Sequence, residues 1–194
     1  MRDLRLVGVA AIALLVLGTI AHAGAHEFVA STTGTLKATK GKEIFTFGSA
    51  KVTCTQLSVK GSVATAKEQT QNVTVLPSKC EGFGSAKVTV SEAEFLFEAS
   101  LGASEIGPIV VLTNAVGKCS IKIEGAGAEG TSKGGEGTLK YTNTGKEIKT
   151  TQLVTEIEYE SSGGVCGEPE MAYTNGTIEA EGTVEVEKGT IKWT

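Results

Sequence analysis

The sequence predicts an all-β protein, an antiparallel two-sheet β-sandwich of the jelly-roll or immunoglobulin-like kind. Threonine and valine recur along the chain, glycine is abundant at 25 residues, and proline occurs only three times. Threonine and valine favour strands, and glycine marks turns. Many short segments alternate apolar and polar residues with a period of two. A β-solenoid is the alternative, and the absence of a fixed repeat period argues against it.

Residues 1–25 have the layout of a secretory signal peptide. Met1–Arg5 is basic, Leu6–Ile20 is almost wholly apolar, and Ala21–Ala25 is rich in small residues, with a cut expected after Ala23 or Ala25. The apolar run is shorter than the roughly 20 residues needed to cross a bilayer as a helix. An uncleaved membrane anchor is the alternative, and the A-x-A ending argues against it. We therefore expect a secreted single domain over residues 26–194, with no membrane span after cleavage.

The expected mature chain lacks the residue types that most catalytic sites use. Both arginines, the only aspartate and His22 precede the cleavage point, and His26 stands at the new N-terminus. A Ser-His-Asp triad, a histidine zinc site, an aspartate-rich calcium loop and arginine-based phosphate capture are therefore excluded. Sixteen lysines and 21 glutamates make the chain mildly acidic without a basic cluster, which argues against nucleic-acid binding. We predict a protein with no catalytic residues, no metal and no cofactor.

Four cysteines behind an export signal predict two disulfides, because extracellular compartments are oxidising. Three pairings of Cys54, Cys80, Cys119 and Cys166 are possible. Cys54–Cys80 with Cys119–Cys166 is favoured, because each bridge then closes within one half of the chain. A zinc site would need closely spaced cysteine pairs, and these four are widely scattered.

The first half of the chain predicts strands whose inward phase changes. Cys54 and Leu57 cannot face the same way without a bulge near Thr55–Gln56, and Val90 is likewise out of phase with Ala93. A strand over Ile109–Leu112, apolar on both faces, is expected to be central. The remaining expectations here are a bulge or tight turn at Ser91–Glu92, a strand around Val73 and Val75, and a strand followed by a loop, rather than a helix, over Ser62–Gln71.

Alternation is clearest in the second half. A long glycine-rich loop over Gly125–Gly137 precedes it, Asn175-Gly176 reads as a type I′ hairpin turn, and Lys188-Gly189 turns the chain into a last strand with Ile191 and Trp193 in phase. The predicted inward sets are Cys119, Ile121 and Ile123; Leu139 and Tyr141; Leu153, Thr155, Ile157 and Tyr159; and Ile178, Ala180, Gly182, Val184 and Val186.

Five short stretches carry a family resemblance: Glu43–Phe47, Ala50–Cys54, Pro77–Gly84, Gly117–Ile121 and Leu139–Asn143. They resemble an uncharacterised multi-copy family of exported, Thr/Gly-rich, disulfide-containing β proteins of soil actinobacteria. The likeness spans most of the mature chain, but its motifs are short. It implies the β fold and the export, and it implies no activity. Relatives often carry a further cysteine about a dozen residues after the Cys-x-x-Phe-Gly segment; its absence here implies that a third disulfide is missing.

The most prominent charged features are two rows of glutamates on strand faces. We interpret them as solvated faces whose repulsion is eased by lysines such as Lys149, Lys188 and Lys192. Weak binding of cations or of a basic surface, or a glycosidase-like carboxylate pair, is the alternative. The rows are Glu156, Glu158 and Glu160, and Glu179, Glu181, Glu185 and Glu187.

The aromatic residues mostly fit inward positions, so we interpret them as core. Tyr173 and Trp193 are the two candidates for an exposed sugar-binding platform. The sequons at Asn72 and Asn175 carry little weight if the protein is bacterial, as the resemblance implies. Together these features predict an exported non-catalytic binding or structural module for an extracellular ligand or surface, of unspecified ligand and oligomeric state. The alternative is a secreted carbohydrate-active enzyme using paired glutamates.

Overall fold

The chain is all-β, as predicted. The computed structural model describes residues 26–64, 67–83, 86–99, 104–106, 109–113, 119–123, 137–163 and 171–194, and these ranges contain strands and no helix. The strands are β1 (Phe28–Ala30), β2 (Gly34–Phe47), β3 (Ala50–Val63), β4 (Thr70–Gly82), β5 (Ala86–Val90), β6 (Ala93–Glu98), β7 (Ser104–Ile106), β8 (Ile109–Thr113), β9 (Ser120–Ile123), β10 (Gly137–Thr144), β11 (Glu147–Ser162), β12 (Met171–Val186) and β13 (Ile191–Trp193).

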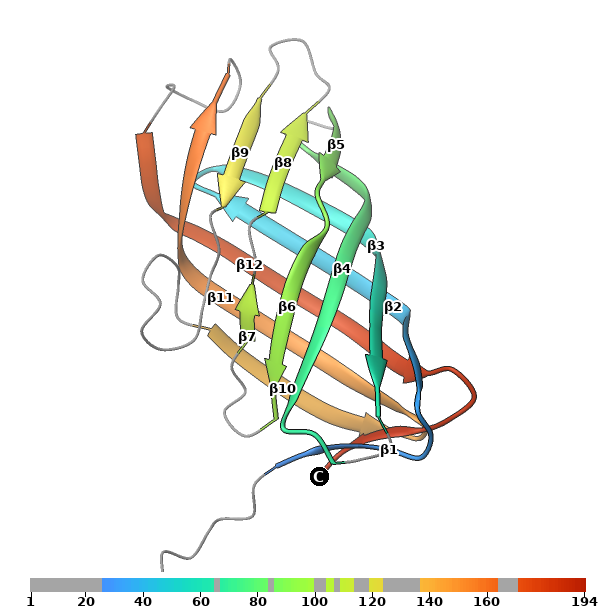
Figure 1. The fold of residues 1–194 in the computed structure, drawn as a ribbon. Helices are drawn as coiled ribbons and strands as arrows, with labels where there is room; N and C mark the ends of the chain where they lie inside the picture. Colours follow the sequence, from blue (N-terminus) through green and yellow to red (C-terminus); the bar gives the residue numbers. More distant parts are fainter. Residues whose placement is uncertain are drawn as a thin grey trace, which may run out of the picture.

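Eleven of these strands form one antiparallel sheet that curls on itself (Figure 1). Its order is β3-β2-β12-β11-β9-β8-β5-β4-β6-β7, and β10 pairs with β11. Because β3 also pairs with β4, the pairings among β2, β3, β4, β5, β8, β9, β11 and β12 return to their starting point. We call the level of the sheet that includes β5, β8 and β9 the closed ring; it occupies the upper part of Figure 1.

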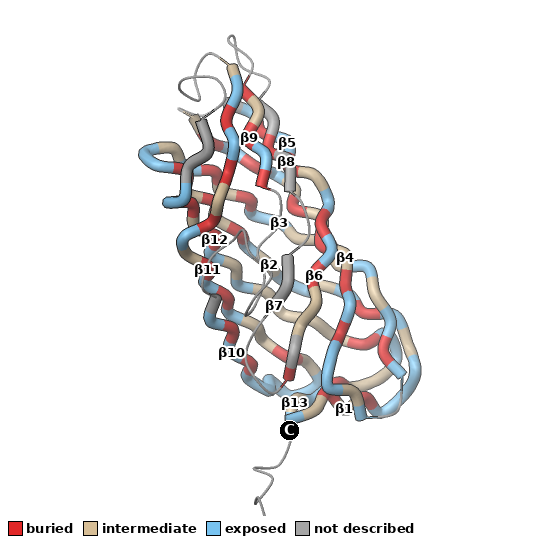
Figure 2. Tube along the Cα trace, turned by 60° about the vertical axis from the view of Figure 1, so that its left-hand side comes forward, coloured by how far each residue is buried: buried red, intermediate tan, exposed pale blue. Residues whose placement is uncertain are grey.

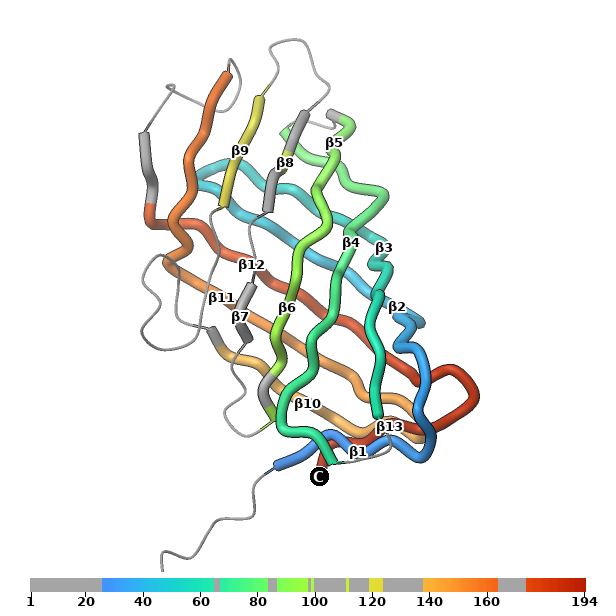
Figure 3. Tube along the Cα trace, in the orientation of Figure 1, coloured from blue at the N-terminus to red at the C-terminus, as the bar shows by residue number. Residues whose placement is uncertain are grey.

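Below the closed ring the sheet is a half-barrel with β7 and β10 at its two edges. A separate two-stranded sheet, β1 with β13, crosses this lower end (Figure 3). The arrangement differs from the predicted pair of stacked sheets. Opposite walls face each other across a core, as in a sandwich, but they belong to one hydrogen-bonded sheet. Long strands such as β4 and β11 make this possible, since each pairs with different neighbours along its two halves.

The core lies inside the curl. Buried and exposed residues alternate along the strands (Figure 2), as expected when one sheet face meets the core and the other meets solvent. The predicted inward sets in β9 and β10 are buried, and so are Ile178 and Val186 of β12. The fully buried side chains of the closed ring include Phe45, Val52, Cys54, Val111, Ile121, Ile123, Ile157 and Ile178.

Along β3, along β4 and along the line formed by β5 and β6, the inward-facing residues switch between even and odd numbers at the same level of the sheet. In β3 the change falls at Thr55–Gln56, as predicted, and in β4 it falls at Ser78–Lys79, where Lys79 has a φ of 52°. β5 and β6 both pair antiparallel with β4 in one register, so Ser91–Glu92 interrupts a continuing strand and does not turn the chain. Because the three strands shift together, their mutual pairing is preserved across the change.

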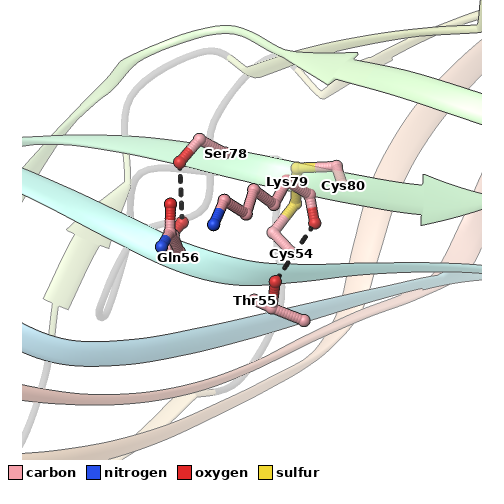
Figure 4. Close-up of a disulfide and its surroundings, with 6 residues drawn as sticks. All are labelled: Cys54, Thr55, Gln56, Ser78, Lys79 and Cys80. Atoms are coloured by element: carbon pink, nitrogen blue, oxygen red, sulfur yellow. Dashed lines mark hydrogen bonds between the residues drawn. A yellow bond between two sulfur atoms is a disulfide. The ribbon is translucent and has the colours of Figure 1, made fainter.

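The disulfide Cys54–Cys80 joins β3 to β4 just above this level, which confirms the first of the two predicted bridges (Figure 4). Two hydrogen bonds tie the same strands beside it. Thr55 Oγ1 donates to the Lys79 carbonyl at 3.4 Å, and Ser78 Oγ donates to the Gln56 carbonyl at 3.5 Å. Cys119 is also disulfide-bonded. Its predicted partner, Cys166, lies outside the described residues.

The phase predicted for the first half of β11 is wrong. Val154 is buried at 2% exposure, whereas Leu153 is 41% exposed and Thr155 is only half-buried. The register with β12 shifts between Val154 and Ile157, and Glu156 between them has a φ of 59°. This bulge restores the predicted phase from Ile157 onward, so a single alternation could not describe the whole strand.

The turn predicted at Asn175-Gly176 is also wrong, because both residues lie within β12. Gly176 pairs with Ile157 at the β11 bulge. A Cβ atom on Gly176 would come within 2.9 Å of the Ile157 carbonyl oxygen. The glycine therefore permits a close approach of two strands and does not form a hairpin turn.

The β11 bulge predicts a small effect of truncating Leu153 and a large effect of truncating its neighbour Val154. Leu153→Ala should change the free energy of unfolding by less than about 0.5 kcal/mol, because the side chain is exposed. Val154→Ala should cost about 1 to 3 kcal/mol, because it opens space in the core. Urea denaturation of both variants measures the difference. A larger loss for Leu153→Ala would contradict the placement of the bulge.

The β1–β13 sheet closes the lower end of the half-barrel through several polar contacts. The Asn143 side chain of β10 exchanges two hydrogen bonds with the Trp193 backbone, at 2.7 and 2.8 Å. The Trp193 indole N–H donates to the Ala99 carbonyl at 3.0 Å, and its ring stacks on His26. These contacts hold Phe28 and Ile191, which are both buried, against the interior.

Two sequence predictions fall where the structure gives no description. The signal segment over residues 1–25 and most of the glycine-rich loop over 125–137 lie outside the described residues. In the ranges that are described, no helix of a length and hydropathy suited to crossing a membrane occurs.

Candidate functional site: a buried cavity with an unpaired carboxyl group

A cavity of about 80 Å³ lies inside the half-barrel, between the closed ring and the β1–β13 sheet. A dry apolar cavity of about 150 Å³ holds benzene, and a water molecule takes up about 30 Å³ in the liquid, so this cavity has room for about two or three water-sized groups. Its walls are mainly apolar. The apolar lining includes Phe28, Leu36, Leu57, Val59, Val73, Val75, Phe95, Phe97, Tyr141, Ile148, Val184 and Ile191.

Small residues at inward positions of two adjacent strands leave this space open. β2 contributes Ala38 to the lining, and β12 contributes Ala180 and Gly182. The place that a Gly41 side chain would take is filled by Leu57, whose side-chain atoms lie 2.7 Å from a Cβ built there. Gly182 differs, because a Cβ atom there would meet only Thr150 Oγ1 at 3.5 Å and the Lys40 carbonyl at 3.8 Å. The cavity is therefore a consequence of side-chain size along β2 and β12.

The paired glycines predict opposite effects of the same substitution. Gly182→Ala should raise the free energy of unfolding by about 1 kcal/mol, because a methyl group enters open apolar space and the unfolded chain loses freedom. Gly41→Ala, at the register partner of Gly182, should lower it by about 1 to 3 kcal/mol, because Leu57 must move. Thermal unfolding of the two variants measures both. Destabilisation by Gly182→Ala would show that the space is not open.

Glu43 is the buried charged residue of this cavity. It lies in the middle of β2, between Cys54 of β3 and Ala180 of β12, and is 1% exposed. Neither Oε1 nor Oε2 has a hydrogen-bond partner among the described residues. Burial raises the pKa of the carboxyl group from its ordinary 4.5 to about 8. Glu43 is therefore mostly protonated at neutral pH, since removal from water disfavours its charged form.

Gln71 of β4 is a second buried polar group in the same lining, at 5% exposure. Its amide nitrogen donates to Glu68 Oε2, and Glu68 Oε1 accepts from the Ala64 backbone N–H at 3.3 Å. A carboxylate only accepts hydrogen bonds, so this contact fixes which end of the Gln71 amide faces Glu68. Gln71 Oε1 is thereby left without a donor among the described residues.

The glutamate rows lie on the outer face of the sheet, as interpreted from the sequence. Every member is exposed or half-buried. Lys149 pairs with Glu181 at 2.5 Å, and Lys37 pairs with Glu187 at 3.0 Å. Hydrogen bonds from these lysines hold the pKa of each of the two glutamates below its ordinary value. The rows therefore lie among cross-strand lysines.

Of the two aromatic candidates, Trp193 is half-buried and held by Ala99 and Asn143, while the side chain of Tyr173 lies outside the description. Asn72 and Asn175 are exposed and lie within β4 and β12. No group of three or more potential metal-ligating side chains occurs among the described residues.

Sequence reasoning missed Glu43 and Gln71, although the signal was present. Glu43 is in phase with Phe45 and Phe47, and Gln71 is in phase with Val73 and Val75. A period of two therefore places each polar residue on a buried face. Comparisons with protein-family models, curated proteins and solved structures find no match, so the interpretation of this site rests on its own geometry.

Proposed function

We propose that this protein is a non-catalytic binding module that holds a small, largely apolar ligand in the cavity of the half-barrel. One observation carries the proposal: Glu43 is buried in an apolar cavity with both carboxyl oxygens unpaired. A buried polar group without a partner costs about 1 to 3 kcal/mol, and native proteins contain few of them. A ligand that enters the cavity and contacts Glu43 would supply the missing partner and fill the space.

The composition of the lining supports binding over hydrolysis. Glycosidases use a pair of carboxyl groups on opposite sides of the scissile bond. Among the described residues Glu43 is the one carboxyl group that lines the cavity, and the glutamate rows lie on the opposite face of the sheet. The many apolar walls and few polar groups match the usual composition of a ligand site.

We also propose that the protein acts outside the cytoplasm. The bonded Cys54–Cys80 pair supports an oxidising compartment, and the sequence pattern of residues 1–25 supports export. Intact mass measurement of the protein recovered from culture medium should give a chain that begins at Gly24 or His26 with four oxidised cysteines. Retention in the cytoplasm with free thiols would contradict this part of the proposal.

Xenon is a suitable first probe, because it is a single apolar atom that enters dry apolar cavities. Titration followed by NMR should shift resonances of Leu36, Val73 and Ile148, which line the cavity. Ala180→Leu should abolish these shifts by filling the space, and Gly182→Ala should weaken them with less risk to folding. Leu153→Ala, on the outer face, is the matched control and should bind normally. Absence of binding to the folded wild type by xenon and by polar probes of similar size would overturn the proposed function.

A further inference from the structure

We propose that the ligand is a short aliphatic alcohol whose hydroxyl group pairs with the carboxyl group of Glu43 while its alkyl group fills the apolar space beside it. This inference rests on the proposed function and adds the chemical class of the ligand. It depends on the two unpaired oxygens of Glu43, on the small residues next to them and on the size of the cavity.

Ala180 leaves room beside Glu43 on the inner face of the sheet. The register places Ala180 of β12 between Glu43 of β2 and Gln152 of β11, and all three line the cavity. Neighbouring strands lie about 5 Å apart, so the backbones of Glu43 and Gln152 are separated by about 10 Å, with the Ala180 methyl group as the side chain between them. A small molecule that contacts Glu43 therefore lies over Ala180, near Leu57 and Gly182 of the same lining.

Glu43 offers a ligand one hydrogen-bond donor and one acceptor. Burial raises the pKa of its carboxyl group to about 8, so at pH 6 one oxygen carries a proton and the other accepts. Both oxygens are unpaired in the part of the chain that the structure describes. The oxygen of an alcohol accepts a hydrogen bond and its O–H group donates one. A single hydroxyl group therefore complements both oxygens of Glu43.

Water and charged ligands match the site less well. A water molecule has a second O–H group, which apolar walls cannot accept, whereas an alcohol has carbon in that position. An ammonium or carboxylate ion would have to leave water for an apolar space in which Glu43 is uncharged. Lys40, the cationic residue of the described lining, is exposed and gives Glu43 no hydrogen bond. A hydrocarbon would leave both oxygens of Glu43 unpaired.

The size of the cavity limits the alkyl group to one or two carbons. Room for about two or three water-sized groups corresponds to methanol or ethanol. The affinity that each non-hydrogen atom can contribute is limited, so we expect a dissociation constant for ethanol on the order of millimolar or weaker. A longer alcohol would require movement of packed walls such as Leu57.

NMR titration at pH 6 with ethanol, propane and the ethylammonium ion tests the ligand class, since the three have the same number of non-hydrogen atoms. The measured quantity is the ratio of the propane dissociation constant to that of ethanol, in which contacts with the apolar walls largely cancel. We expect this ratio to be at least tenfold larger in the wild type than in Glu43→Met, where the hydroxyl group has no partner. Ethylammonium should not bind.

Two further variants define the role of Glu43. Glu43→Gln should keep the wild-type ratio within about threefold, because the amide also offers a donor and an acceptor and the variant rescues the pairing. Glu179→Met carries the methionine substitution to the exposed face of β12, and it is the matched control that should behave as wild type. Thermal unfolding of each variant confirms that it is folded before titration.

The outcomes separate this inference from the proposed function. Binding of xenon or propane with an unchanged ratio in folded Glu43→Met would overturn the alcohol class and leave the binding module in place. Tighter binding of ethylammonium than of ethanol would do the same. Loss of the ratio in folded Glu43→Gln would overturn the pairing of a hydroxyl group with an uncharged carboxyl group. Failure of xenon, propane and ethanol alike would overturn both proposals.

Discussion

Replacement of Glu43 by glutamine is expected to stabilise the protein at pH 9 and to leave its stability almost unchanged at pH 4. The pKa of the buried carboxyl group is about 8 in the folded protein and near its ordinary 4.5 in the unfolded chain. The folded state therefore binds more protons between these values, and stability falls as the pH rises through this window. Below pH 4.5 Glu43 is protonated in both the folded and the unfolded state, so its contribution to stability is fully present.

At pH 9 the free energy of unfolding of Glu43→Gln should exceed that of the wild type by on the order of 4 kcal/mol, because each pKa unit corresponds to about 1.4 kcal/mol. Glutamine has the size of the protonated acid and cannot ionise. The free energy of unfolding of the variant therefore does not fall as the pH rises through this window. Urea denaturation at pH 4, 7 and 9 measures the free energy of unfolding of both. A wild-type protein that is no less stable than the variant at pH 9 would contradict the burial of Glu43.

Glu181→Gln is a control for which the expected change in stability has the opposite sign. The hydrogen bond from Lys149 holds the pKa of Glu181 below its ordinary value, so its contribution to stability is present above pH 4.5 and is lost as the pH falls. Removing this exposed carboxylate should destabilise the protein slightly at pH 7 and 9, and less at pH 3. Salt should weaken the effect of Glu181→Gln and should not weaken that of Glu43→Gln, because screening acts mainly on exposed charges.

Removal of the Cys54–Cys80 disulfide is expected to cost about 3 to 4 kcal/mol. The two cysteines are 26 residues apart, and a closed loop of that size reduces the entropy of the unfolded chain by a corresponding amount. The bond also lies in the closed ring, at the level where β3 and β4 change phase. Replacing both cysteines with alanine and measuring urea denaturation tests the expectation.

Ser78→Ala is a matched control for the disulfide variant. Ser78 lies on the same strand and contributes one long hydrogen bond, at 3.5 Å, to the Gln56 carbonyl. Its removal should cost less than about 1 kcal/mol. Hydrogen exchange should show faster opening of β3 and β4 in the disulfide variant only. A loss of stability no greater than that of Ser78→Ala would contradict a stabilising role for the bridge.

The fold and the cavity depend on one another. The closed ring is filled by large side chains such as Phe45 and Ile157, whereas the cavity in the half-barrel below is lined by the small residues Ala38, Ala180 and Gly182. Stability is thus concentrated in one part of the sheet, and open space with an unpaired Glu43 occurs in the other. Natural proteins commonly retain such locally unfavourable features at functional sites.

The sequence by itself determined the all-β class and most inward faces, and it favoured the Cys54–Cys80 bridge among three possible pairings. Side-chain alternation along a strand is a local property, because successive residues point to opposite faces whatever the strand pairs with. The phases of β9, β10 and β12 could therefore be predicted, and the phase of Glu43 with Phe45 already indicated a buried carboxyl group. A preference for pairing nearby cysteines was sufficient for the bridge between β3 and β4.

Tertiary structure alone decided how the strands close and where the cavity lies. Alternation does not specify which strands become neighbours, so the β3–β4 and β9–β11 pairings that curl one sheet could not be distinguished from two stacked sheets. The exposure of Leu153 depends on a bulge at Glu156, which has no distinctive local sequence. Leu57 packs over Gly41, whereas a Cβ atom on Gly182 would make only ordinary contacts with Thr150 and the Lys40 carbonyl. Long-range packing alone decides which of these two glycines is covered.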